Sequence, residues 1–406
     1  MKERTMDKLQ TDAKLLGRLQ SFQKISLIVG VLALIVLAAG FFLDTEHFFA
    51  AYLVGWVFWI QVALGGLLLL LIQNTVGGRW GLVIQRISEA ATMTLPLLAV
   101  LFLVILIGIP HLYHWADADA VAHDTLLQAK APYLNVPFFI VRAVIYFVIW
   151  IGAAYLLRKW SAQLDDNPDD ADLRKKLRNL SAPGILIFGF TVTFASVDWM
   201  MSLEPHWYST IYGMTFGVSA MAAGFAFAVV LVMWLLKFKP WSEVVLPLDV
   251  SDLGNWLLAS IMLWAYLVFS QFLIIWSANL PEETTWYLAR TQGGWQWVAI
   301  INVTLHFFLP FFFLLARGTK RAPGRLFKIA ALVLIMRFAD LVWRIIPAFS
   351  PGKLTFPWLS VVAWIAIGGL FMTVFFQQLT KANFFPTYDS RLAVHAEKEE
   401  ATSHVS

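Results

Sequence analysis

The sequence predicts an all-α integral membrane protein with about ten transmembrane helices. Of its 406 residues, 59% are apolar and only 14% are charged, whereas about a quarter of the residues in an average soluble domain are charged. Apolar runs recur along the chain at close to the ~20 residues that a helix needs to cross ~30 Å of hydrocarbon. Lysine and arginine residues gather between alternate runs, which is the pattern that the positive-inside rule describes.

Ten apolar segments have the length of a membrane span, and the connections between them leave no room for a soluble domain. The segments are Ile25–Leu43, Phe49–Ile72, Thr92–Ile109, Val136–Leu157, Ala182–Met201, Ile211–Leu236, Gly254–Trp276, Gly294–Ala316, Leu326–Ile345 and Trp358–Gln378. Each is expected to be a helix, because a segment in lipid has to satisfy its own backbone hydrogen bonds.

The basic residues set the expected orientation. With the N-terminus inside, the inside segments hold 24 of the 30 lysines and arginines, and the outside loops hold only 3. Both chain ends are therefore expected in the cytoplasm. Residues 1–24 are expected to form a charged interfacial segment, residues 25–378 the transmembrane domain, and residues 379–406 a polar tail that is mobile after Phe385.

The composition excludes several kinds of site. The chain has no cysteine, which excludes disulfides, iron–sulfur ligation and covalently attached c-type haem within it. An intrinsic b-type haem is rejected as well, because such a haem needs two opposed axial histidines and His306 is the only histidine deep in a span. The basic residues lie at membrane edges without a nucleic-acid-binding motif, and no metal site is expected.

Three charged residues share one face of the ninth span. Arg337, Asp340 and Arg344 are spaced three and four residues apart, and residues at that spacing lie above one another on a helix. Charges within a span are costly and usually face the bundle interior. Two interpretations stay open, a salt bridge that fixes packing and a proton relay through Asp340. The relay requires one arginine to point away, because two guanidinium charges oppose protonation of the carboxylate.

Further proton-transfer candidates lie in the seventh and eighth spans. His306 follows Asn302 by one turn, and it is either a proton carrier or a histidine hydrogen-bonded to a neighbouring helix. Asp252 and Asn255 open a stripe of small and partly polar residues at helical spacing. The stripe continues through Ala259, Met262, Tyr266 and Ser270. It either lines a water-accessible path or, as we favour, forms an ordinary helix–helix seam.

A motif at the outer end of the fifth span combines titratable and aromatic side chains. Asp198, Trp199, Glu204 and His206 lie within nine residues of one another. Quinol oxidation needs a base for the hydroxyl proton and a slot for the ring, so these residues are candidates for a quinone site. Helix capping and an interfacial aromatic belt would explain the same residues.

The surrounding segment resembles a known family. Residues 194–213 read FASVDWMMSLEPHWYSTIYG, which is similar to a hallmark of the NrfD/polysulfide-reductase-type membrane subunits of bacterial alternative complex III, a quinol:cytochrome c oxidoreductase. The chain length and the ten spans resemble the second, shorter of the two such subunits, the F subunit.

This resemblance implies an architecture and a set of partners. Spans two to five and six to nine would form two four-helix bundles, with the first and tenth spans outside them. The partners would be a multihaem cytochrome c subunit, an iron–sulfur subunit, a sister NrfD-like subunit and small membrane subunits in the bacterial inner membrane. Quinone or menaquinone would be the associated substrate, with the sister subunit the better candidate for the quinol site beside the iron–sulfur subunit.

Three functions remain after the sequence analysis. The first is a quinone-binding or proton-conducting subunit of a respiratory complex, which would hold no redox metal and would not be an enzyme on its own. The second is a secondary transporter for a small solute, although Pro96 and Pro310 do not form the matched helix breaks of an internal repeat. The third is a scaffold whose polar residues only fix helix packing.

Overall fold

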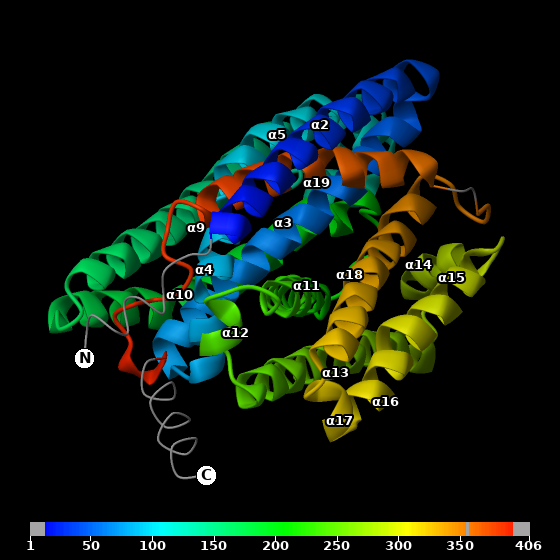
Figure 1. The fold of residues 1–406 in the computed structure, drawn as a ribbon. Helices are drawn as coiled ribbons and strands as arrows, with labels where there is room; N and C mark the ends of the chain where they lie inside the picture. The colour runs from blue at the N-terminus through cyan, green and yellow to red at the C-terminus, as the bar shows by residue number, and fades with distance from the viewer. Residues whose placement is uncertain (1–12, 355–356, 393–406) are drawn as a thin grey trace, which may run out of the picture.

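Helices make up the regular structure of this chain (Figure 1). The computed structural model describes residues 13–354 and 357–392, and every regular element in these two ranges is a helix or a helical turn. The all-α fold class that the sequence predicts is confirmed, and the protein is a multi-pass membrane protein.

Ten long helical units in the described ranges are candidates for membrane spans. Eight have the length and composition of a span, and they are α2 (Ala13–Leu43), α3 (Thr45–Val76), α9 (Val136–Asp166), α10 (Ala171–Trp199), α11 (Tyr212–Leu235), α13 (Pro247–Ala278), α15–η3–α16 (Trp295–Asn302, Val303–Phe308 and Leu309–Leu315) and α19 (Trp358–Leu379). The ninth joins α4 (Arg79–Thr92) to α5 (Leu95–Ile107) at a 40° bend. The tenth is α18 (Pro323–Ile345), which is long enough but carries more charge.

Short helices connect these units. They are α6 (Ile109–Leu112), η1 (His114–Ala116), α7 (Ala118–His123), α8 (Thr125–Lys130), η2 (Met201–Leu203), α12 (Trp241–Val244), α14 (Pro281–Thr291), α17 (Arg317–Lys320), η4 (Ile346–Ala348) and η5 (Ser390–Leu392). Most of these lie in the loops between spans, where polar side chains cap the exposed amide groups of the helices.

The spans form two bundles, as the family resemblance implies. Helices α3, α4–α5, α9 and α10 pack together, and so do α11, α13, α15–α16 and α18. The two bundles meet where α11 packs along α3 and α10, while α2 and α19 lie outside them against α3 (Figure 1). Helices α3 and α11 are therefore the central helices of the molecule, and most of their side chains are buried.

Glycines allow the central helices to approach closely. A Cβ atom added at Gly65 of α3 would lie 2.0 Å from the carbonyl oxygen of Ala220 in α11, and one at Gly224 would lie 2.7 Å from the backbone of Gly65. Close backbone approach is a common way to associate helices in lipid, where burial of apolar side chains gives little driving force. The contact fixes the distance between the two bundles.

Both described chain ends lie at the same end of the bundles. Phe22, near the start of α2, stacks on Phe376, near the end of α19, with ring centroids 5.9 Å apart. We call this end, where α3, α9 and α11 also finish, the terminal face, and we call the other end the opposite face. The terminal face corresponds to the side that the charge distribution predicts to be cytoplasmic.

The two end segments are in contact with the helical bundles where they are described. Residues 13–24 run into the first span as part of one continuous helix, α2, instead of forming a separate interfacial helix. Residues 386–392, predicted to be mobile, pack against the terminal face through the contacts of Thr387 and Tyr388. Residues 1–12 and 393–406 lie outside the described residues.

The third span begins 13 residues earlier than predicted, at Arg79 instead of Thr92. Helix α4 is polar in composition, and yet Gln85, Arg86 and Glu89 are each about 3% exposed. Hydropathy assigned this segment to a loop because a hydropathy scale scores each polar side chain without its hydrogen-bond partners. In the fold they bind one another and their neighbours, so they are accommodated inside the first bundle.

Candidate functional site

Helix α18 buries its three charged residues against the central helices. Arg337, Asp340 and Arg344 are 1%, 2% and 6% exposed and share one helix face. Arg337 Nη1 and Arg344 Nε both donate to the same atom, Asp340 Oδ2, each at 2.8 Å. Neither arginine points away from Asp340, so the condition for a relay through Asp340 is not met in this arrangement. A proton reaches that oxygen only after one of the two bonds opens.

Arg290 links this stripe to the opposite face. Its guanidinium group is fully buried and donates to both carboxylate oxygens of Glu204. Arg290 Nη2 also donates to the carbonyl oxygen of Arg344 at 2.8 Å, and the group lies over the Trp286 ring, 3.8 Å from its centroid. Because the side chain of Glu204 is 27% exposed, a continuous set of polar contacts leads from the opposite face to α18.

Gln61 of α3 ends the set on the inner side. Its Oε1 atom accepts a hydrogen bond from Arg337 Nη2 at 3.1 Å, which ties the second bundle to the central helix of the first. We call the complete group the Asp340 network, and it consists of Gln61, Glu204, Arg290, Arg337, Asp340 and Arg344. Asp340 lies five residues before the end of α18, about 7–8 Å along the axis, so the network occupies the half of the membrane near the opposite face.

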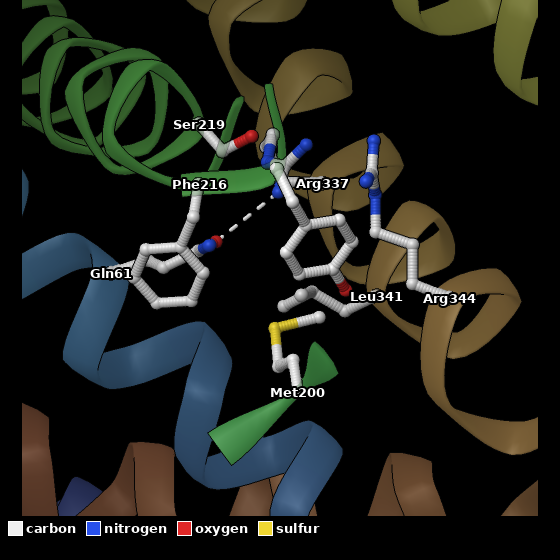
Figure 2. Close-up of a pocket in the computed structure, with 8 residues that line it drawn as sticks. Gln61, Met200, Phe216, Ser219, Arg337, Leu341 and Arg344 are labelled. Atoms are coloured by element: carbon white, nitrogen blue, oxygen red, sulfur yellow. Dashed lines mark hydrogen bonds between the residues drawn. The ribbon is translucent and has the colours of Figure 1, made fainter. Parts of the chain in front are cut away.

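A small cavity lies beside the Asp340 network (Figure 2). Its volume of about 10 Å³ is about the room that one water molecule needs. Its polar lining consists of Gln61, Tyr212, Ser219, Arg337 and Arg344, and its apolar lining of Met200, Phe216 and Leu341. The cavity is therefore rich in hydrogen-bond donors but too small for an organic ligand.

His306 lies beside this network on a π-helical turn, η3. The His306 ring packs on Trp264 with centroids 4.1 Å apart and interacts electrostatically with Arg337 and Asp340. Four buried atoms here, His306 Nδ1, both amide atoms of Asn302 and the Trp264 indole nitrogen, have no hydrogen-bond partner within the described ranges. Single π-helical turns often mark functional sites, and these atoms provide sites for ordered water.

Asp198 is engaged in a different ion pair, within the first bundle. Arg142 donates to its two oxygens through Nε and Nη2, each at 2.8 Å, and the Tyr146 hydroxyl donates at 2.9 Å. The neighbouring Trp199 is 0% exposed and packs edge-on against Trp56, with centroids 4.9 Å apart. A quinol hydroxyl would therefore compete with Arg142 and Tyr146 for the Asp198 carboxylate.

The outer motif does not gather into one cluster. Asp198 pairs with Arg142 and Glu204 with Arg290, while His206 Nε2 lies 2.6 Å from Asp124 Oδ2 in a solvent-exposed pair. The backbone amide of Leu127 and the His206 ring hold the pKa of Asp124 below its usual value. The predicted titratable residues therefore lie in three separate ion pairs.

Asp252 and Asn255 do not lead into the bundle interior. Asn255 is exposed and accepts a hydrogen bond from Lys320 Nζ at 2.7 Å, at the terminal face. Farther along the predicted stripe, Met262 and Tyr266 are 47% and 65% exposed. This face of α13 points outward, so the stripe lines no path within the described part of the chain. This outward-facing stripe on α13 could still pack against a helix of another chain.

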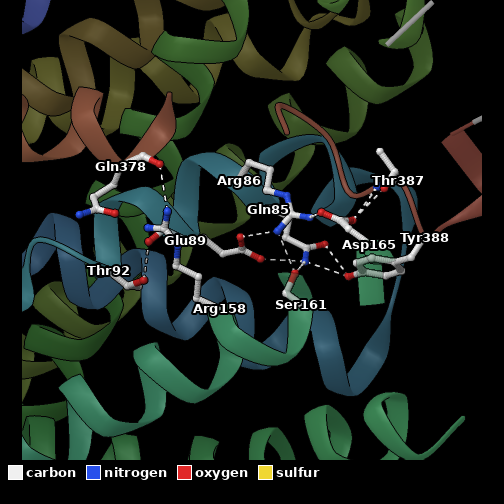
Figure 3. Close-up of polar contacts among 10 residues, drawn as sticks. All are labelled: Gln85, Arg86, Glu89, Thr92, Arg158, Ser161, Asp165, Gln378, Thr387 and Tyr388. Carbon is white, nitrogen blue, oxygen red and sulfur yellow. Dashed lines mark hydrogen bonds and ion pairs between the residues drawn. The ribbon is translucent and has the colours of Figure 1, made fainter. Parts of the chain in front are cut away.

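A second buried network lies in the first bundle, near the terminal face (Figure 3). Glu89 is 3% exposed, and it accepts hydrogen bonds from Arg86 Nη1 at 2.7 Å and from Gln85 Nε2 at 3.0 Å. Arg86 also donates to Asp165 and, at 3.0 Å, to the hydroxyl of Ser161 in α9. Glu89 is the eleventh residue of α4, about 15 Å from its start, so the network reaches well into the membrane.

The segment after α19 covers this second network. The hydroxyl of Tyr388 contacts the side-chain amide of Gln85 at 2.9 Å, and the backbone amide of Thr387 donates to Asp165 at 2.9 Å. Arg158 lies alongside and donates to the carbonyl oxygen of Gln378 at 3.1 Å. We call the group the Glu89 network, and it consists of Gln85, Arg86, Glu89, Arg158, Ser161, Asp165, Thr387 and Tyr388.

Sequence reasoning missed several members of both networks. Gln61 is a lone polar residue in an apolar span, Arg290 was assigned to an outer loop, and Glu89 to an inner loop. The available signals were the rarity of a glutamine at mid-span and the three-residue spacing of Arg86 and Glu89, which is the spacing of a helical ion pair.

Comparison with known proteins adds no family. No protein-family model matches the chain, and no curated protein sequence matches it. The fold and the two networks define the class as an all-α, multi-pass membrane protein with buried ionic networks in both halves of the membrane.

Proposed function

We propose that this chain is a metal-free membrane subunit of a quinol-linked respiratory complex and that it conducts protons across the membrane. The observation that carries the proposal is the pair of buried networks, one in each half of the membrane. Intramembrane ionisable residues are costly, and they often mark ion or proton pathways. The Glu89 network would serve the terminal face and the Asp340 network the opposite face.

The two networks supply the groups that proton transfer requires. Carboxylates such as Glu89 can accept and release protons, while hydroxyl and amide side chains such as Ser161 and Gln61 can hold the intervening waters. Helix α3 runs between the networks and carries Gln61 at mid-span. The charges of Arg337 and Arg344 oppose protonation of Asp340, so conduction through Asp340 requires an arginine to move away, and we assign that step to a conformational change in the working complex.

The proposal includes the partners that the family resemblance implies. A chain without cysteine has no ligands for iron–sulfur clusters or c-type haem. Electrons from quinol or menaquinone would therefore pass through an iron–sulfur subunit and a multihaem cytochrome c, with the sister membrane subunit holding the quinol. Purification from the native host in mild detergent should recover haem c and an iron–sulfur protein together with this chain.

Proton conduction is tested by variants that remove a carboxylate from each network in the reconstituted complex. Glu89→Gln, and the double variant Asp340→Asn with Arg337→Gln, remove titratable carboxylates while limiting unpaired charge. In proteoliposomes, quinol oxidation by either assembled variant should drive a lower proton-to-electron ratio than the unaltered complex. Asp252→Asn is the control, because Asp252 lies outside both networks. An unchanged ratio in both network variants would show that the networks are structural.

The proposed location is the bacterial cytoplasmic membrane, with both chain ends inside. The absence of native cysteine makes labelling unambiguous. Asp169→Cys on the terminal face should react with a membrane-impermeant reagent only after the cells are opened, and Lys353→Cys on the opposite face should react in intact cells. The reverse pattern would overturn the orientation.

A solute transporter is the alternative function. The cavity beside the Asp340 network has room for about one water molecule, which is too small for an organic solute. A solute would therefore need another site, or a second conformation in which this cavity is larger. A colourless, monodisperse preparation from the native host that transports a solute without other subunits would favour it over the respiratory role.

A further inference from the structure

The Asp340 network carries an excess positive charge. Its buried guanidinium groups are those of Arg290, Arg337 and Arg344, whereas its carboxylates are only those of Asp340 and Glu204. Glu204 is paired with Arg290, so Arg337 and Arg344 share the single carboxylate of Asp340. The described residues of the network therefore hold a net charge of +1 at neutral pH.

Among the residues that the structure describes, no carboxylate other than those of Asp340 and Glu204 pairs with these arginines. The groups that interact electrostatically with these arginines from other elements are Tyr212, Tyr287 and His306. Tyrosine and histidine are neutral or positive near pH 7, so none of the three is an anion. A buried charge without a counterion is strongly unfavourable, because the protein interior solvates it poorly.

The cavity lies where a counterion would neutralise this charge. Arg337 and Arg344 both line it, together with Ser219 and Tyr212 of α11. Figure 2 shows the Ser219 hydroxyl directed toward the guanidinium group of Arg337. Arg337 Nε is buried and has no hydrogen-bond partner among the residues that the structure describes. Guanidinium and hydroxyl donors around one small space form a typical environment for an anion.

We propose that this cavity binds one small monovalent inorganic anion of the size of chloride, held by Arg337, Arg344 and Ser219. The cavity volume of about 10 Å³ matches a particle close in size to water. That volume excludes phosphate, carboxylate metabolites and a quinone headgroup. The anion makes the Asp340 network neutral and holds α18 against α11. This site is independent of whether the chain conducts protons.

The first test is the thermal stability of the full-length protein in mild detergent. Sodium chloride, sodium bromide and sodium gluconate are compared at constant ionic strength, since gluconate is too large for the cavity. Chloride and bromide should raise the midpoint in a saturable manner by about 2–4 °C or more, because a ligand that binds only the folded state stabilises it. Equal midpoints in all three salts would overturn the proposal.

A matched pair of variants separates charge from size. Ser219→Asp and Ser219→Asn place side chains of nearly the same shape in the cavity, but only aspartate brings the missing negative charge. A buried carboxylate is ordinarily more costly than a buried amide. In gluconate, we nevertheless expect Ser219→Asp to have the higher midpoint and to lose the response to chloride. A higher midpoint for Ser219→Asn, or a Ser219→Asp protein that fails to fold while Ser219→Asn folds, would contradict the site.

Discussion

The two buried networks contain the same kinds of residue but differ in their charge balance. In the Glu89 network, the guanidinium groups of Arg86 and Arg158 are matched by the carboxylates of Glu89 and Asp165. In the Asp340 network, three guanidinium groups are matched by two carboxylates. Buried ions are best tolerated when their charges are matched. The described residues of the Glu89 network balance one another in charge, whereas those of the Asp340 network leave one positive charge unmatched.

The networks also differ in which parts of the chain build them. Arg337, Asp340 and Arg344 belong to one helix and meet through its periodicity. The Glu89 network joins α4, α9 and the segment after α19, so Gln85 and Tyr388 are 303 residues apart in the sequence. The stripe on α18 is fixed when that helix forms. Its contacts with Gln61 and Arg290, like those of the Glu89 network, form only when the helices have assembled.

The largest expected effect comes from removing the shared carboxylate. Asp340→Asn leaves Arg337 and Arg344 buried without their shared carboxylate, which should destabilise the protein by about 3–5 kcal/mol. The free energy of unfolding in mixed detergent micelles measures the loss. Adding Arg337→Gln to the same protein removes one of the two guanidinium charges that lost their carboxylate, and it should recover part of the lost stability. A single variant as stable as the original would show that Asp340 does not balance these arginines.

A smaller loss of stability is expected when a carboxylate is removed from the Glu89 network, in which the charges are balanced. Glu89→Gln removes one carboxylate but leaves Arg86 paired with Asp165, so the loss should be about 1–3 kcal/mol. The same unfolding measurement applies, and Asp169→Asn, at an exposed position, serves as the control. A loss as large as that of Asp340→Asn would mean that Asp165 cannot compensate and that the contrast between the networks is wrong.

The spans were predictable from sequence, but the networks were predictable only in part. Hydropathy and the charge distribution indicated the helical fold and its segments, because both properties are local. The spacing of Arg337, Asp340 and Arg344 indicated their common face for the same reason. Arg290 and Glu204 are 86 residues apart in the sequence and meet only in the folded protein. No periodicity in one sequence records such a pairing.

Helix α4 shows where hydropathy fails for a physical reason. Hydropathy assigns a cost to each polar residue as if that residue faced lipid. In α4, Gln85, Arg86 and Glu89 face α9 and the C-terminal segment, where their hydrogen bonds replace those to water. The predicted boundary at Thr92 therefore marks the end of the polar part of the span, and the helix itself begins at Arg79.

A still smaller loss of stability should follow from removing a contact between the segment after α19 and the Glu89 network. Tyr388→Phe keeps the ring but removes the hydroxyl that contacts Gln85, which should cost about 0.5–1.5 kcal/mol. Hydrogen exchange of residues 380–392 should increase, while exchange in α18 should not change. Tyr155→Phe, at a position 55% exposed, is the control. Faster exchange confined to α18 would contradict the assignment of this segment to the Glu89 network.

The smallest effect is expected at the exposed pair of His206 and Asp124, which serves as a solvent-exposed reference for both buried networks. Asp124 accepts hydrogen bonds from the amides of Leu126 and Leu127, and these bonds together with His206 lower its pKa in the folded protein.

A carboxyl group with a lowered folded pKa stabilises the fold above its unfolded pKa of about 3.9, and that stabilisation is lost as the pH falls through the folded value. Hydrogen exchange of residues 125–130, corrected for its intrinsic pH dependence, should therefore be faster below about pH 4 than at pH 5. Asp124→Asn should remove this pH dependence, and high salt should weaken the contribution of His206 without altering exchange in α18. Protection that stays constant to pH 2 in the unaltered protein would show that Asp124 does not hold the start of α8.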